Sequence, residues 1–320
     1  MRVGIPRALL YYTHYPFWAQ LLRGLGAEVV LSGVTTQKSL ERGLKTAEDE
    51  TCLPVKVAFG HLENLRDRVD YLLLPVHVSL EPGRYMCPKI IGLTDMVRHS
   101  LSDLPPILRP MVNLHESEEE LRAGLWPLAE ALGANRAKLA VALAAAQAAQ
   151  AEFRRLVEDG WWPDQALRRL EGRPAEPPVA GRWQVGVVGH SYLSADGHTS
   201  QNLLRRLGEM GVGTVVSDAV PPAVIDAETR HLPKDLFWTL GRRLLGAGLH
   251  FAKRADLSGV IYLTAFSCGS DSMVEPFIQG AAQAAGRPFL SLTVDEHTAE
   301  AGLITRLEAF VDMVERRRGA

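Results

Sequence analysis

Three cysteines are the residues of this chain with the most distinctive chemistry. Cys52 lies in "ETCLPVKV", Cys87 in "RYMCPK" and Cys268 in "AFSCGSDS". An odd number of thiols cannot all pair as disulfides, so these are either separate core thiols or ligands that share one metal site. Three thiolates could hold a [4Fe–4S] cluster in which one iron lacks a cysteine, or a zinc ion with a fourth donor. The histidines that could supply this fourth donor to zinc are His61, His77 and His297.

The spacing of the cysteines leaves both alternatives open. No two of them form a C-x-x-C pair, and their separations match no local zinc or ferredoxin motif. Their placement is more informative. Cys87 and Cys268 come shortly after two apolar runs, "DYLLLPVHV" at 70–78 and "SGVIYLTAF" at 258–266, that are typical of buried strands. Ligands of parallel sheets bind at the carboxyl ends of the strands, where these cysteines are expected.

Strands alternate with helices in both halves of the sequence, which predicts an α/β fold of two Rossmann-like domains with mainly parallel sheets. The first domain is expected over 1–134 and the second over 183–320. Between them, 135–182 reads as a helical bridge, an Ala-rich helix followed by the linker "RPAEPPVAGR". Cys52 and Cys87 then belong to the first domain and Cys268 to the second, so a shared metal site is expected in the cleft between the domains.

Composition excludes several classes of protein. The 320 residues are 47% hydrophobic and 22% charged, as in soluble globular proteins, and the net charge is -2. Such a charge gives no reason to expect a nucleic acid partner. No apolar run is long enough to span a membrane, and the N-terminal apolar run is too short for a signal peptide. We therefore expect a cytoplasmic, reducing location.

Several polar residues near these positions could take part in chemistry. Glu50, two residues before Cys52, could exchange protons or simply be a solvated surface residue. His297, in "DEHT" after an expected strand, is a candidate acid or base, although a polar loop explains it nearly as well. Gly269 would let the backbone approach a cofactor closely, and Ser270 or Asp271 would cap the following helix. The sequence contains neither a P-loop nor G-x-G-x-x-G, so no nucleotide site is expected.

Five blocks of the sequence, in order, resemble the 2-hydroxyacyl-CoA dehydratase component family, and more narrowly its branch related to CoA-substrate-specific enzyme activases. The resemblance covers most of the chain outside 135–182. The blocks are "VGIPRALLYY", "AEDETCLPVKVAFGHL", "YLLLPVHVSLEPGRYMCPKIIGLTDMVR", "AFSCGSDSMVEPFI" and "RPFLSLTVDEHTAEAGLITRLEAFVDM".

This resemblance implies that Cys52, Cys87 and Cys268 hold a [4Fe–4S] cluster with an open iron. It also implies an ATP-dependent activator of the BadF-like ATPase family, one-electron chemistry on an acyl-CoA or other small substrate, and a homodimer or heterodimer. A branch of the family carries double-cubane clusters, which this chain would form through dimerisation. The chain would then be a dehydratase-like or double-cubane reductase-like component. The alternative is a non-catalytic electron-transfer or scaffolding subunit, or a two-domain small-ligand binder with structural cysteines.

Overall fold

A computed structural model describes residues 1–114 and 118–319 of the chain, which divides into two compact units. Unit 1 comprises Met1–Arg155, Leu170–Gly172 and Leu236–Thr239, and unit 2 comprises Leu156–Arg169, Arg173–Asp235 and Leu240–Ala320. All paired strands in the three sheets run parallel, which confirms the predicted α/β class with mainly parallel sheets. The division at 1–134, 135–182 and 183–320 and the metal site between the domains stay predictions.

Unit 1 is built on a four-stranded sheet in the order β2-β1-β3-β5 and also contains a sheet of two strands, β4 and β6. The strands are β1 Arg2–Ile5, β2 Glu28–Leu31, β3 Tyr71–Leu73, β4 Val76–Ser79, β5 Ile107–Leu108 and β6 Met111–Asn113. The residues of β1 and β3 that face the core are fully or almost fully buried, because helices cover both faces of this sheet.

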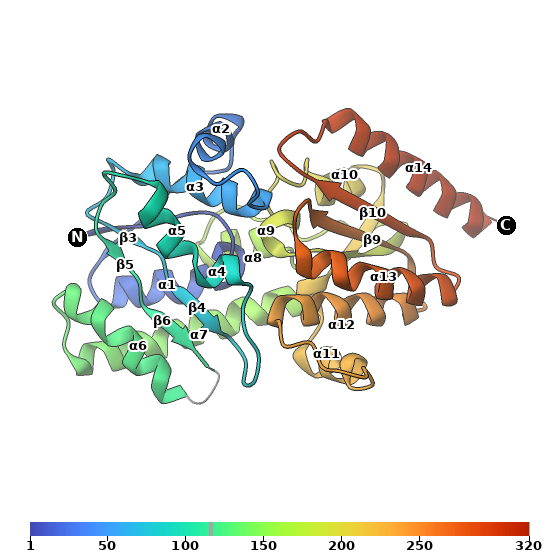
Figure 1. The fold of residues 1–320 in the computed structure, drawn as a ribbon. Coiled ribbons are helices and arrows are strands. Elements are labelled where there is room, and N and C mark those ends of the chain that lie inside the picture. The colour runs from blue at the N-terminus through green and yellow to red at the C-terminus, as the bar shows by residue number, and fades with distance from the viewer. Residues whose placement is uncertain (115–117, 320) are drawn as a thin grey trace. The chain divides into compact units, whose positions relative to one another are not determined.

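The helices of unit 1 lie on the two faces of its four-stranded sheet, with α3 and α5 on one face and α1 and α7 on the other (Figure 1). They are α1 Tyr11–Gly24, α2 Gln37–Thr46, α3 Leu53–Leu65, α4 Pro88–Ile91, α5 Leu93–Ser100, α6 Glu118–Ala131 and α7 Arg136–Glu158, the last counted in unit 1 as far as Arg155. The Ala-rich segment forms α7, and Lys138 Nζ donates to the carbonyl of Leu25, 2.9 Å away, at the end of α1.

Two of the predicted strands are each broken at a proline. The run 70–78 forms β3 and β4 on either side of Pro75, and "PPILRPMVNL" forms β5 and β6 on either side of Pro110. Proline lacks the N–H that a central strand must donate, so neither strand continues in the main sheet. The segments that follow pair with each other instead, as β4 with β6.

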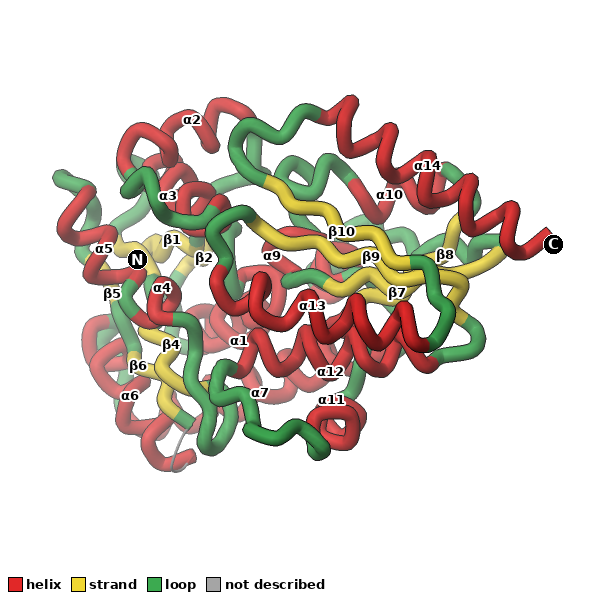
Figure 2. Tube along the Cα trace, turned by 45° about the vertical axis from the view of Figure 1, so that its right-hand side comes forward, coloured by secondary structure: helices red, strands yellow, loops and turns green. Residues whose placement is uncertain are grey.

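Unit 2 contains one four-stranded sheet in the order β10-β9-β7-β8. Its strands are β7 Trp183–Val188, β8 Val212–Val216, β9 Leu257–Ala265 and β10 Phe289–Val294. The helices α12 and α13 lie on one face of this sheet and α14 on the other (Figure 2). The helical segments are α8 Pro163–Leu170, α9 Ser191–Ser194, α10 Leu203–Glu209, η1 Ser217–Ala219, α11 Pro222–Thr229, α12 Thr239–Lys253, α13 Gly269–Ala284 and α14 Glu300–Gly319.

The strand order of unit 2 places a crossover between β7 and β9. The chain goes from β7 to the neighbouring β8, and then passes over β7 to enter β9 on its other side. In open parallel sheets, ligands bind outside the carboxyl ends of the two strands at such a reversal. Val188 and Ala265 end these strands, so a ligand of this sheet is expected to contact the residues that follow them. None of the helices in the described part of the chain is long and apolar enough to cross a membrane.

Candidate metal centre

Each of the three cysteines occupies the N-cap position of a helix. Cys52 precedes α3, Cys87 precedes α4 and Cys268 precedes α13. None of the three forms a disulfide, and all are partly exposed. The unpaired backbone N–H groups of a helix start carry partial positive charge, which favours a thiolate at this position. Pro54 and Pro88 stand in the first turns of the two helices in unit 1, where a missing N–H costs nothing.

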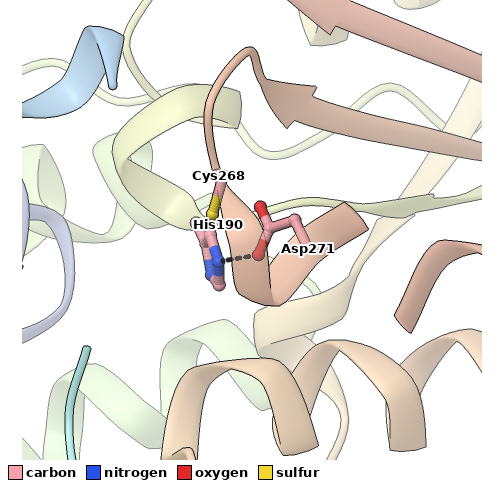
Figure 3. Close-up of side chains that lie close together, drawn as sticks. All are labelled: His190, Cys268 and Asp271. Atoms are coloured by element: carbon pink, nitrogen blue, oxygen red, sulfur yellow. Dashed lines mark hydrogen bonds and ion pairs between the residues drawn. The ribbon is translucent and has the colours of Figure 1, made fainter. Parts of the chain in front are cut away.

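In unit 2, Cys268 lies beside His190 and Asp271 (Figure 3). One donor atom from each of these three side chains lies within 4.8 Å of the others. His190 follows β7 directly, and Cys268 and Asp271 come from the segment that links β9 to the first turn of α13. The crossover of the sheet therefore brings together three residues that could bind a metal ion.

His190 and Asp271 form a buried ion pair, in which His190 Nε2 donates to Asp271 Oδ1 at 2.9 Å. Burial alone would lower the pKa of His190, but the charge and hydrogen bond of Asp271 outweigh it, so this pKa is raised. Burial alone would likewise raise the pKa of Asp271, and the charge of His190 overcomes it, so that pKa is lowered. The pair is therefore an imidazolium and a carboxylate at neutral pH.

Neighbouring polar groups hold the Asp271 carboxylate in place. Thr264 Oγ1 donates to Oδ2 at 3.2 Å, and Ser270 Oγ donates to Oδ1 at 3.3 Å. The phenol of Tyr262 donates to the Asp271 carbonyl at 2.9 Å. Ser270 Oγ also lies 3.5 Å from Cys268 Sγ, so the same serine contacts the thiol and the carboxylate. A fully buried carboxylate with this many donors has a fixed orientation.

A second, partly buried carboxyl, that of Asp218, follows β8, which pairs with β7 on the side opposite β9. Ser191 Oγ donates a short hydrogen bond to Asp218 Oδ1, while Asp218 Oδ2 is buried and has no hydrogen-bond partner among the described residues. Burial raises the pKa of Asp218, against the opposing effects of the Ser191 hydrogen bond and the charge of His190. Two carboxyl groups at this edge of the sheet, one after β9 and one after β8, thus have pKa values shifted in opposite directions.

The other residues singled out in the sequence lie in more open surroundings. Glu50 is exposed in the turn before Cys52, and His297 is exposed in the loop after β10. Asp295 accepts from the backbone N–H of His297 at 2.9 Å and from Thr298 Oγ1 at 2.8 Å, so "DEHT" forms a hydrogen-bonded turn. Gly269 is exposed, and a side chain built there would meet no atom within 4 Å outside its chain neighbours and its own helix backbone. The catalytic roles of Glu50 and His297 stay predictions.

Two histidines considered as zinc donors are in enclosed positions in unit 1. Both ring nitrogens of the fully buried His61 lie at hydrogen-bonding distance from hydroxyls, Nδ1 2.7 Å from Ser32 Oγ and Nε2 2.9 Å from Thr35 Oγ1. His77 is buried in β4, and burial lowers its pKa to about 4. A metal ion bound by either histidine would therefore have to lie in the interior of unit 1.

Sequence reasoning missed His190 and assigned Asp271 the wrong role. Ser270 or Asp271 was expected to cap α13, but no side chain caps that helix, and the Asp271 carboxylate turns into the core toward His190 instead. His190 follows an apolar run, "WQVGVVG", just as Cys268 follows "VIYLTAF". That shared position after two buried strands is the signal that could have identified it.

The chain belongs to the family described as CoA enzyme activase uncharacterised domain, which matches residues 2–220. The match includes Cys52, Cys87, His190 and Asp218, and it ends before Cys268 and Asp271. No curated protein matches the chain. Membership of this family agrees with the activase-related branch indicated by the sequence, without identifying a particular member.

Proposed function

We propose that this protein is an iron–sulfur component that works with an ATP-dependent activator in a reducing cytoplasm and acts on an acyl-CoA or another small substrate. Cys52, Cys87 and Cys268 would be its cluster ligands. The observation that carries the proposal is that all three cysteines are outside any disulfide, partly exposed and located at helix N-caps. Membership of a CoA enzyme activase family supports the activator and the type of substrate.

The residues present fit a [4Fe–4S] cluster by the chemistry of their donors. A cluster of this kind is held by cysteine thiolates, and helix N-termini stabilise thiolates. Such a cluster, when bound, passes single electrons and can bind a substrate atom at an iron that lacks a cysteine.

The residues around Cys268 have roles that follow from their contacts. His190, as an imidazolium, can donate a hydrogen bond toward the Cys268 sulfur and offset its negative charge. The Asp271 carboxylate accepts a hydrogen bond from His190 Nε2 and so fixes the imidazole ring. Thr264 Oγ1 donates to the other oxygen of the same carboxylate. Glu50, exposed close to Cys52, and His297, exposed at the end of β10, are the proposed proton-exchanging groups.

Reconstitution with iron and sulfide under anaerobic conditions tests the proposal. The wild-type protein should become brown and bind about four irons per chain. The variants Cys52→Ser, Cys87→Ser and Cys268→Ser should each lose the cluster, whereas Ser272→Ala, an exposed position on α13, should retain it. A colourless wild-type protein, or full iron content in any of the three cysteine variants, would refute the assignment of these ligands.

Catalysis and electron transfer can be separated once the cluster is present. If an iron is open to substrate, addition of an acyl-CoA or cyanide should change the spectrum of the reduced cluster. An unchanged spectrum would favour the alternative of an electron-transfer or scaffolding subunit. Gel filtration of the reconstituted protein, alone and mixed with a candidate activator ATPase, tests for a homodimer or a complex.

A further inference from the structure

The group formed by Cys268, His190 and Asp271 offers three different donor types within one unit of the protein. A thiol, an imidazole nitrogen and a carboxylate oxygen lie within 4.8 Å of one another. We propose that these three side chains bind a single divalent transition-metal ion, such as Zn²⁺ or Fe²⁺, without any contribution from unit 1. Sulfur, nitrogen and oxygen donors of this kind are the usual ligands of zinc and of other divalent ions of the first transition series.

The separations between the donor atoms are close to those that a tetrahedral ion requires. With Zn–N and Zn–O bonds of about 2.0 Å, two such ligands lie about 3.3 Å apart, and a sulfur and a nitrogen ligand about 3.6 Å apart. His190 Nε2 and Asp271 Oδ1 are now 2.9 Å apart. To bind an ion, this pair would move apart by a few tenths of an ångström, and the sulfur of the partly exposed Cys268, now within 4.8 Å of both donors, would move closer by up to about 1 Å.

The charges around the site also suit a cation. The carboxylate of Asp271 is fully buried beside His190 Nε2, and metal binding would release the Nε2 proton to solvent, so that the ion takes the place of this proton between the two side chains. The N-terminus of α13 stabilises the anionic forms of Cys268 and Asp271. Thr264 Oγ1, 3.2 Å from Asp271 Oδ2, would keep the second carboxylate oxygen occupied while the first binds the ion.

The site has a free side for a fourth ligand. Cys268, one of the three donors, is partly exposed to solvent. A water molecule or a substrate atom can reach an ion from that direction. Three protein ligands with one open position is the arrangement of catalytic zinc sites, whereas structural zinc sites have four protein ligands.

This inference goes beyond the proposed function because it needs neither Cys52 nor Cys87. Cys268 cannot ligate a single ion and a cluster at the same time, so the two are alternative occupants. The single ion would be held by the protein before a cluster is assembled, or in place of one.

Cobalt(II) is the probe of choice, because a cobalt–thiolate bond absorbs light by charge transfer. The Cys52→Ser/Cys87→Ser double variant, which cannot hold a three-cysteine cluster, is titrated with Co²⁺ under anaerobic conditions. We expect one Co²⁺ per chain, a thiolate-to-cobalt charge-transfer band and the ligand-field bands of a tetrahedral ion. In the same background, Cys268→Ser should lose the charge-transfer band, and His190→Gln and Asp271→Asn should weaken binding at least tenfold.

Matched controls are His231→Gln and Asp312→Asn, both at exposed positions of unit 2, which should bind Co²⁺ as the parent does. The absence of a charge-transfer band in the double variant would overturn the proposal. So would unchanged Co²⁺ affinity when both His190 and Asp271 are replaced.

A second measurement does not depend on variants of the buried pair folding correctly. In the double variant, Zn²⁺ should slow the alkylation of Cys268 by iodoacetamide at least tenfold, as read by mass spectrometry. An unchanged alkylation rate at saturating Zn²⁺ would overturn the proposal. This outcome is distinct from failure of the proposed function, which is measured by the iron content of the wild-type protein.

Discussion

His190 Nε2 lies 2.9 Å from Asp271 Oδ1, and this contact joins the end of β7 to the first turn of α13. Both side chains are buried, His190 at 6% and Asp271 at 0% exposure. An ion pair at this depth stabilises the fold only while both partners are present, since either charge alone would be buried without compensation. The geometry around Cys268 therefore depends on this pair whether or not a metal is bound.

Replacement of His190 by Gln should destabilise the protein by about 3 kcal/mol, the usual cost of leaving a buried charge unpaired. The pKa of His190 is raised in the folded state, so its contribution is complete below the unfolded value of about 6.5 and is lost as the pH rises toward the folded value. The pKa of Asp271 is lowered, so its contribution is present above about pH 4 and is lost in acid.

Urea unfolding of the wild type and of His190→Gln at pH 5.5 and at pH 9 checks this prediction. The difference in unfolding free energy between them should be larger at pH 5.5. His231→Gln, an exposed histidine of the same unit, should show no such difference. Equal effects of His190→Gln at both pH values would mean that the ion pair does not titrate as its surroundings imply.

Substitution of Asp218 should raise the unfolding free energy, whereas substitution of His190 should lower it. Its pKa is raised by burial, so ionisation costs the folded protein stability as the pH rises above the unfolded value of about 4. Asp218→Asn removes that cost and keeps an oxygen that can accept from Ser191 Oγ. We expect Asn to raise the unfolding free energy at pH 8 by about 1 kcal/mol and to have a smaller effect at pH 4.5.

Thermal melts of Asp218→Asn at pH 4.5 and pH 8 provide the measurement, with Asp312→Asn at an exposed position of α14 as the control. A lower melting temperature of Asp218→Asn at pH 8 would show that the folded protein uses the ionised carboxylate. The buried Oδ2 would then have to be satisfied by a group other than the described residues.

Much of the fold could be predicted from the sequence because strand and helix patterns are local. The apolar run before Cys268 forms the strand β9, and the first part of the run before Cys87 forms the strand β3. The breaks at Pro75 and Pro110 were harder to predict, because a proline can also stand at the edge of a continuing strand. Only the pairing of β4 with β6 shows that both strands leave the main sheet.

The candidate metal centre could be predicted only in part, because its residues are distant in sequence. Cys268 was recognisable from its residue type and position. His190 is 81 positions from Asp271, and only the crossover of the sheet brings them together. Asp271 also had a plausible local role as a helix cap, and a buried partner far away in the chain overrode it.

The close packing of α2 against α3 should make Gly60 essential for the position of Cys52. A side chain at Gly60 would lie 1.9 Å from the Ser39 carbonyl oxygen, and one at Gly43 would lie 1.9 Å from the Lys56 carbonyl oxygen. Backbone atoms cannot yield as side chains do, so Gly60→Ala should force α3 away from α2 and cost about 3 kcal/mol. Since Cys52 is the N-cap of α3, its thiol would move with the helix.

Chemical denaturation and the alkylation rate of Cys52 both report this change. Gly280→Ala is a matched control, because that glycine also lies in a helix, α13, but its added methyl would meet no atom within 4 Å. Alanine has the higher helix propensity, so the control should be neutral or stabilised by up to about 1 kcal/mol. Equal stability of Gly60→Ala and the wild type would show that the two helices can separate without cost.

Protonation of His77 should destabilise the folded protein in mild acid. Burial lowers its pKa to about 4, and its Nε2 is buried without a hydrogen-bond partner among the described residues. The unfolded chain binds a proton at this residue below about pH 6.5. Stability is therefore complete above that value and is lost as the pH falls toward 4, by up to about 3 kcal/mol.

His77→Phe removes the titrating group and keeps an aromatic ring in β4, where the His77 ring now meets Trp18 edge-on at 6.0 Å between centroids. Between pH 6.5 and pH 4.5 this variant should lose less unfolding free energy than the wild type, by about 2 kcal/mol. His99→Phe, at an exposed position of α5, should follow the wild type. If the unfolding free energy of His77→Phe falls with pH as steeply as that of the wild type, folding does not lower the pKa of His77. The folded protein would then bind a proton at His77 in mild acid, and Nε2 would donate a hydrogen bond within unit 1.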